Sequence, residues 1–199
     1  MKSNMDDKKK ALGESINEFS QFRLALTSES DRGCALFAAA YLDNALSKLL
    51  SACMVQGKRL EEDLFSGQAP LSTFSSRIKL AFYMGKIAES ERKDLDSIRG
   101  IRNEFAHHPE QLTFENQSIR DRCANLNHNW RGKYVGPRTK FNATVSALLI
   151  NIVVETIQST SPNDKEERPM HDEVKQRGLA LVAYFDEVLK STATPCTDS

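Results

Sequence analysis

Residues 31–54 read DRGCALFAAAYLDNALSKLLSACM, and this stretch decides how the rest of the chain has to fold. Apolar side chains recur in it at the spacing of one helix face, while Asp43, Asn44 and Ser47 fall on the other side. The apolar face is rich in alanine, so a neighbouring helix can approach it closely. We therefore predict a central helix with the buried face Ala35, Ala38, Ala39, Leu42, Ala45, Leu46, Leu49, Leu50 and Cys53.

Helical spacing continues on both sides of this stretch, whereas strand signals are scarce. Glycine, proline and clusters of small polar residues separate the apolar segments from one another. We predict an all-α fold, a single helical bundle of about six to eight helices. The expected helices are residues 6–26, 31–54, 60–65, 72–87, 91–106, 113–126, 139–158 and 170–190.

One linker-like stretch interrupts the helical pattern. Residues 159–169 read STSPNDKEERP, which is polar and contains two prolines. We therefore expect residues 1–158 to form the bundle domain. Residues 159–199 are expected to form a linker, a C-terminal helix over residues 170–190 and a disordered tail over residues 191–199.

The charge balance limits the classes of partner that the chain can bind. Lysine and arginine number 27, and aspartate and glutamate also number 27, so the net charge is zero. Attraction to phosphates dominates DNA affinity, and the chain as a whole has no surplus positive charge to supply it. Any nucleic acid would need a local basic patch.

Other patterns indicate a cytoplasmic protein without a metal or cofactor. The charged start MKSNMDDKKK is not followed by the apolar run of a signal peptide, and the apolar stretch 145–154 is too short to span a membrane. Cys34, Cys53, Cys123 and Cys196 form no CxxC pair and have no histidine at zinc-ligand spacing. We expect no cofactor and no membrane partner.

The segment RGIRNEFAHHP, residues 99–109, holds an arginine in an unusual place. On a helical wheel Arg102 falls within the same arc as Leu95, Ile98, Ile101 and Phe105. A guanidinium that faces a core or an interface needs a carboxylate, a phosphate or water. Asp43 on the central helix is a candidate partner for it.

Two histidines follow Arg102 at the point where Pro109 should end the helix, at or before His108. Either His107 or His108 could then fold back toward Arg102. Together with Asn103, the Arg-to-His spacing resembles the signature of HEPN domains, helical modules that often dimerise. That resemblance implies a metal-independent ribonuclease in which histidine is the acid–base group and arginine holds the phosphate. Two alternatives stay open: an ordinary helix ending favoured by the macrodipole, and a binding cleft without catalysis.

A loop further along interleaves aromatic and basic side chains, as proteins that bind single-stranded nucleic acid do. The candidate residues for such contact are Trp130, Arg131, Lys133 and Arg138. Loops of this composition are also commonly exposed to solvent without binding anything, so the alternative is a loop that makes no contact with nucleic acid.

A longer set of features resembles the mannitol operon repressor (MtlR) family. In order along the chain these features are Pro70-Leu71-Ser72, Arg77-Ile78-Lys79-Leu80, Gly85-Lys86-Ile87, Asp94-Leu95, Ile98-Arg99, Ile101-Arg102-Asn103 and His107. The similarity covers residues 32–119 well and residues 140–157 more loosely. The N-terminal helix, the loop RGKYVGPR and the tail after Ser159 have no clear counterpart.

The resemblance implies a transcriptional regulator of the repressor type. Members of the family are helical and lack a helix-turn-helix, so the resemblance implies regulation through a protein partner at least as readily as through DNA. It also implies control of genes for mannitol or sugar-alcohol uptake. We expect a homodimer packed through the helix 91–106, and no enzymatic activity; the alternative is an RNA-binding or RNA-cleaving HEPN-like domain.

Overall fold

The computed structural model describes residues 19–108, 112–128, 136–162 and 172–192. Within these residues there are eight helical segments and no strand, which confirms the predicted all-α bundle. The segments are a helical stretch at residues 19–28, α2 (Asp31–Ala52), the short π-helix η1 (Glu61–Phe65), α3 (Phe74–Tyr83), α4 (Glu89–His107), α5 (Gln117–Ala124), α6 (Pro137–Gln158) and α7 (Asp172–Thr192).

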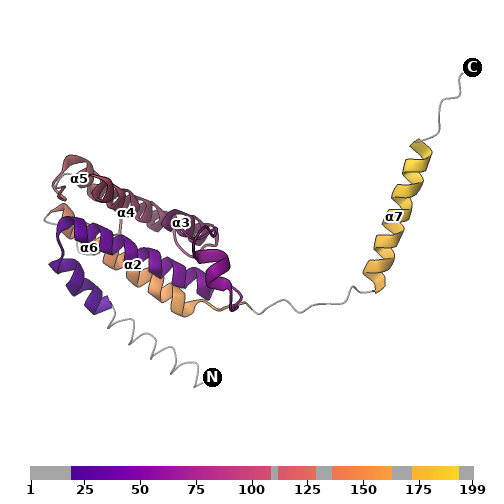
Figure 1. Cartoon of the computed structure of the whole chain (residues 1–199), viewed down its shortest axis with the longest axis horizontal. Coiled ribbons are helices and arrows are strands. Elements are labelled where there is room, and N and C mark those ends of the chain that lie inside the picture. The colour runs from indigo at the N-terminus through magenta and orange to yellow at the C-terminus, as the bar shows by residue number, and fades with distance from the viewer. Residues whose placement is uncertain (1–18, 109–111, 129–135, 163–171, 193–199) are drawn as a thin grey trace, which may run out of the picture. The chain divides into compact units, whose positions relative to one another are not determined.

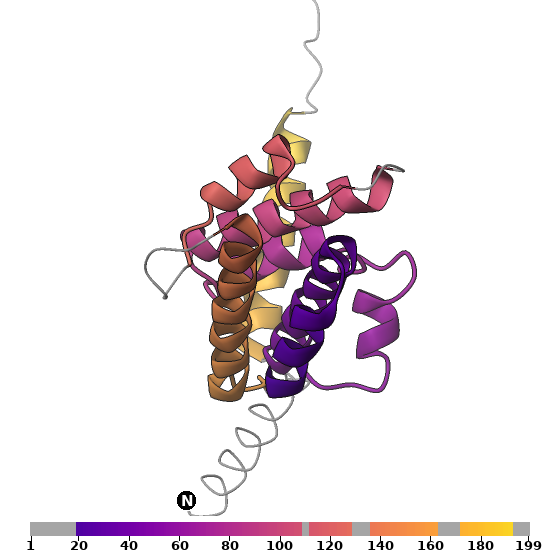
Figure 2. The same cartoon turned by 90° about the vertical axis from the view of Figure 1, so that its left-hand side faces the viewer.

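Helix α2 is the centre of the bundle, as its alanine-rich face predicts. It packs against α3, α4 and α6, with α3, α4 and α5 forming one layer over α2 and α6 (Figure 1). Cys34 Sγ lies 3.1 Å from Asn142 Oδ1, and Cys53 Sγ lies 3.4 Å from Ser159 Oγ. These contacts join the start of α2 to the start of α6 and the end of α2 to the end of α6, so the two helices run parallel. Helix α4 passes across α6 (Figure 2).

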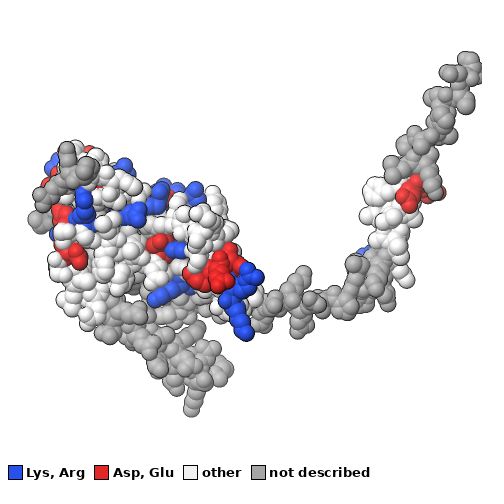
Figure 3. Space-filling model, viewed as in Figure 1, with Lys and Arg blue, Asp and Glu red and all other residues white. Residues whose placement is uncertain are grey.

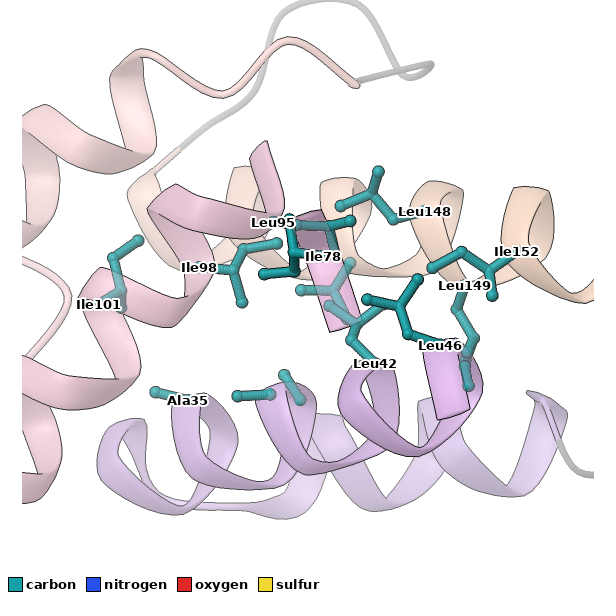
Figure 4. Close-up of a cluster of buried hydrophobic side chains, with 14 of the residues drawn as sticks. Ala35, Leu42, Leu46, Ile78, Leu95, Ile98, Ile101, Leu148, Leu149 and Ile152 are labelled. Atoms are coloured by element: carbon teal, nitrogen blue, oxygen red, sulfur yellow. The ribbon is translucent and has the colours of Figure 1, made fainter. Parts of the chain in front are cut away.

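The core fills the space between the two layers. Leu42 and Leu46 of α2 meet Ile78 of α3, Ile98 of α4 and Leu148 of α6 (Figure 4). Every member of the predicted buried face of α2 is buried except Cys53, which is half-buried. The alanines let α4 and α6 come close to the α2 backbone, so the same face that predicts the helix also fixes its neighbours.

The ends of α2 and α4 show how local sequence positions these helices. Ser30 caps α2, because its Oγ accepts a hydrogen bond of 3.1 Å from the backbone N–H of Gly33. Ala88 is the cap residue of α4, and the Glu91 carboxylate accepts its N–H at 2.7 Å. Helix α4 ends at His107, as predicted from Pro109.

Two helices are shorter than their apolar patterns predict. Helix α3 stops at Tyr83 because Gly85 takes a positive φ of 68°, which reverses the chain and ends the helix. Helix α5 starts only at Gln117, because the Asn116 side chain accepts the N–H of Thr113 at 2.7 Å and holds a turn there.

Helix α6 is longer than its apolar stretch suggests. It has 22 residues, and an 18-residue window within it has a mean hydropathy of 1.3, so by length and composition alone the helix is apolar enough to cross a membrane, which the stretch 145–154 by itself does not indicate. One face of the helix nevertheless belongs to the core of the bundle. Phe141, Val145, Leu148, Leu149 and Ile152 are buried there, whereas Ile150 and Val154 are exposed.

The chain divides into two compact units, Met1–Asn163 and Asp164–Ser199. The first contains the bundle, and the second contains α7. Helix α7 continues to Thr192, so the disorder expected from residue 191 is wrong at residues 191 and 192. The rest of the expected tail, residues 193–199, lies outside the described residues.

Candidate functional site

A cleft of about 470 Å³ opens where α2, α3 and α4 meet. It contains three of the residues that the sequence singles out, namely Asp43, Arg102 and Asn103. Its other lining residues are Leu36, Ala39 and Ala40 of α2, Ser72, Thr73, Phe74 and Ser75 around the start of α3, and Arg99 of α4. The cleft therefore combines an apolar wall, a helix start and two guanidinium groups.

Asp43 lies in the cleft but is not the partner of Arg102, so that prediction is wrong. Its carboxylate pairs with Arg77 of α3, whose Nη1 is 2.8 Å from Asp43 Oδ1. Arg77 also donates to the backbone carbonyls of Leu71 at 2.7 Å and Phe65 at 3.2 Å, and its side chain is only 12% exposed. These bonds hold the connector between η1 and α3 against α2, and the Arg77 guanidinium neutralises the charge of Asp43.

Arg102 is exposed rather than turned into the core, which corrects the wheel argument. Its Nη1 donates to Asn103 Oδ1 at 2.9 Å. The wheel places Arg102 between Ile98 and Leu95, both fully buried, but it ignores position along the helix axis. Arg102 lines the cleft, to which Ala39 and Ala40 of α2 contribute only short side chains.

Arg99 is a second cationic residue of the cleft, and the sequence argument missed it. Its Nη2 lies 3.4 Å from Asp96 Oδ1, which is a long contact, and its side chain is 36% exposed. Its Nε is buried and has no hydrogen-bond partner among the described residues. A buried donor without an acceptor is costly and is uncommon in proteins.

The start of α3 adds backbone donors to the same cleft. Thr73 is the cap residue, and its Oγ1 accepts the N–H of Ser76 at 3.1 Å. The N–H groups of Phe74 and Ser75 precede Ser76 in the first turn, where a helix offers no internal acceptor. Because these groups also carry the positive end of the helix dipole, the arrangement favours an anion.

Comparison with known proteins identifies the family of this chain. The family described as "Mannitol repressor" matches residues 20–160 of the sequence. The chain belongs to the mannitol repressor family. The match extends over nearly all of the bundle, from the helical stretch 19–28 to the end of α6. It therefore covers more of the chain than residues 32–119 and 140–157, where the sequence resemblance lies.

A solved structure shows the same fold. The chain resembles the structure described as "X-ray structure of the MtlR-HPr complex from Escherichia coli" with a TM-score of 0.58 and 18% sequence identity. The similarity covers 68% of this chain and 98% of that one. At this identity the likeness concerns the fold. No curated protein matches the sequence.

In this mannitol repressor family member the two histidines do not complete an Arg-to-His pair. His107 and His108 are both exposed at the end of α4, and among the described residues no hydrogen bond joins either imidazole to Arg102. The carbonyl of His108 instead accepts a hydrogen bond from Arg32 of α2. This end of α4 is therefore tied down by its backbone, and its histidines stand apart from the cleft.

The predicted nucleic-acid residues divide into two groups. Trp130, Arg131 and Lys133 lie outside the described residues. Arg138 lies at the start of α6, where its Nη1 pairs with Asp31 Oδ1 at 2.7 Å and its Nη2 donates to the carbonyl of Glu29. Arg138 thus holds α6 against the start of α2.

Sequence reasoning also missed a buried carboxylate in this family member. Asp94 of α4 is 1% exposed and accepts the backbone N–H groups of Asn127 and His128 at 2.9 and 2.8 Å. It also contacts His128 Nδ1 at 2.8 Å. Asp94 lies on the same wheel arc as Ile98 and Ile101, so the pattern that drew attention to Arg102 could have found it.

The described residues contain no group of three side chains that could bind a metal ion. Cys34 and Cys123 are buried core residues, and burial raises the pKa of their thiols to about 11 and about 12. Such thiols are protonated at neutral pH and are poor nucleophiles. The polar groups that line the cleft are guanidinium, hydroxyl, carboxylate, amide and backbone N–H groups.

Proposed function

We propose that this chain is a repressor-like regulator of transcription that acts through a protein partner. The observation that carries the proposal is the mannitol repressor family match over residues 20–160. The helical bundle offers clefts and side-chain surfaces for a partner. The proposed regulator is a cytoplasmic protein that catalyses no reaction and needs neither a membrane nor a cofactor.

The charge distribution supports a protein partner over direct DNA recognition. The 27 basic residues are balanced by 27 acidic ones, and the two signs are interspersed on the face shown in Figure 3. DNA binders concentrate lysine and arginine on one surface, because phosphate contacts supply most of their affinity. Arg138, one of the basic residues proposed for such contact, is engaged in an internal ion pair instead.

The solved relative indicates which partner to test first. That structure is described as a complex of MtlR with HPr. The fold similarity to this chain covers 98% of the chain in that structure. We therefore propose an HPr protein from the same organism as a partner of this chain. The regulated genes proposed here are those for uptake of mannitol or a related sugar alcohol, in keeping with the family description.

A homodimer packed through α4 remains part of the proposal. An outer face of this helix carries Arg92 and Lys93 beside Glu89 and Asp96, a mixture of charges that a second copy could match. Multi-angle light scattering of the purified chain gives its mass directly. A monomer mass at all concentrations tested would contradict the dimer without touching the rest of the proposal.

Isothermal titration calorimetry of the full chain with the HPr protein of its own organism tests the proposed partner. We expect saturable binding with a stoichiometry of one HPr for each chain. The control is an unrelated small globular protein of similar net charge, which should give no heat of binding. Absence of saturable binding to HPr, with both proteins shown to be folded, would overturn HPr as the partner.

A further inference from the structure

We propose that the cleft between α2, α3 and α4 binds a small organic phosphate monoester. The carrying observation is that Arg99 and Arg102 line one cleft together with the start of α3. This inference goes beyond the proposed function and does not depend on it, because it rests on the donors and charges of the cleft alone.

The charges that line the cleft are positive in sum. Arg99 and Arg102 contribute two positive charges, and Asp43 contributes the one negative charge. That negative charge is already paired with Arg77 at 2.8 Å, and Arg77 is mostly buried and is not among the lining residues of the cleft. The carboxylate nearest Arg99 is Asp96, which also pairs with Arg92 at 3.0 Å and is therefore shared. Arg102 has only the Asn103 amide oxygen as a hydrogen-bond partner among the described residues.

The donors of the cleft match the acceptors of a phosphate group. Arg102 offers a planar fork of N–H groups, which suits two phosphate oxygens at once. Arg99 adds the buried Nε that lacks an acceptor, and an anion oxygen would supply one. The first-turn N–H groups of Phe74 and Ser75 and the hydroxyl of Ser75 are further donors in the same lining.

The size and the opposite wall of the cleft indicate a small molecule. Its volume of about 470 Å³ lies within the range of small-molecule sites. On the α2 side it is lined by Leu36, Ala39 and Ala40, which can pack against a carbon skeleton while the arginines hold the anionic end. A phosphate monoester has both parts, whereas inorganic phosphate would leave this wall uncovered.

Calorimetric titration of the full chain with glycerol phosphate and mannitol phosphate tests the proposal, with mannitol, inorganic phosphate and a phosphoserine peptide as comparison probes. We expect saturable binding of at least one of the two esters, tighter than that of mannitol or inorganic phosphate. No saturable binding of either ester would overturn the proposal. Equal binding of mannitol and its phosphate, or binding of the peptide alone, would also overturn it.

Three variants connect the binding to this cleft. Arg102→Gln should weaken ester binding by about ten- to one-hundredfold, because it removes a charge-assisted pair of hydrogen bonds. Arg120→Gln is the matched control: Arg120 of α5 is exposed and donates to the Gln117 amide oxygen at 2.7 Å, much as Arg102 does to Asn103. Its affinity for the ester should stay unchanged.

Ala40→Leu keeps both arginines and fills the cleft from the α2 side. Ala40 is exposed, so the larger side chain should not disturb folding, and thermal unfolding of the variant checks this directly. We expect ester binding to be lost in this variant as well. Undiminished ester binding in folded Arg102→Gln and Ala40→Leu proteins would place the ligand elsewhere and contradict the proposal.

Discussion

At the scale of single residues, the strongest polar anchor in the bundle is the Asp94 carboxylate. It is almost completely buried and receives the backbone N–H groups of two consecutive residues, Asn127 and His128, as well as the Asn127 side-chain amide at 3.0 Å. These bonds tie the segment after α5 to the second turn of α4. A buried carboxylate is tolerated only when it is satisfied in this way.

Replacing Asp94 by asparagine should destabilise the protein. The amide keeps one acceptor oxygen and turns an NH2 group toward N–H donors, so we expect a loss of about 2–3 kcal/mol in the free energy of unfolding. Urea denaturation followed by circular dichroism measures it. The control Asp121→Asn, at an exposed carboxylate of α5 that accepts from Gln117, should change stability by less than about 0.5 kcal/mol. Equal stability of the two variants would show that Asp94 is not an anchor.

The thiols should differ in reactivity according to their burial. With pKa values of about 11 and about 12, the thiols of Cys34 and Cys123 are almost fully protonated at pH 8 and are buried as well. Cys53 is half-buried at the end of α2, so iodoacetamide should label it first among these three. Because the pKa values are raised, labelling of Cys34 and Cys123 in the native protein should rise only well above pH 9. Peptide mapping by mass spectrometry follows each thiol, and rapid labelling of Cys34 at pH 8 would contradict this assignment.

Residue-level features of the site could be predicted only in part. A helical wheel found Arg102 because it reports angle around the helix, but it could not tell that a cleft opens between α4 and its neighbours at this position. Which acid pairs with which arginine depends on the three-dimensional arrangement, so the sequence offers Asp43 only as a candidate partner for Arg102, whereas in the structure it pairs with Arg77 of α3. Arg99 and the start of α3 become part of the cleft only when three helices meet.

At the scale of elements, the alanines of α2 set the distance to its neighbours. Ala38 is fully buried, whereas Ala40 on the same helix is exposed. Ala38→Leu inserts three carbon atoms between packed helices and should cost about 1–3 kcal/mol of stability. Ala40→Leu is the matched control and should cost less than about 0.5 kcal/mol. Thermal and urea unfolding of both variants compare them, and a neutral Ala38→Leu would mean that the helices are not closely packed there.

Helix identities were predictable because apolar periodicity is strong in this chain. Both long helices of the lower layer, α2 and α6, end within two residues of their predicted limits. The errors occur where a single local interaction overrides periodicity. Gly85 ends α3 early through its positive φ, and Asn116 delays α5 by binding Thr113. Such effects depend on one dihedral angle or one hydrogen bond, which a spacing argument does not contain.

At the scale of the whole molecule, the bundle should fold without the C-terminal unit. Among the described residues, every core side chain lies between Phe22 and Ile152. We therefore expect a protein of residues 1–163 to unfold cooperatively, with a melting temperature within a few degrees of that of the full chain. Circular dichroism during heating measures both. Loss of the cooperative transition in the shortened protein would show that residues 164–199 contribute to the core.

We propose that this mannitol repressor family member regulates through a protein partner and does not itself recognise a DNA sequence. The direct test is fluorescence anisotropy of the purified chain with a labelled duplex from upstream of the host's mannitol uptake genes, at physiological salt, against a scrambled duplex of equal length. The charge balance predicts weak binding that is the same for both sequences. Tight binding to the native duplex, with a preference of about a thousandfold or more over the scrambled one, would contradict the account.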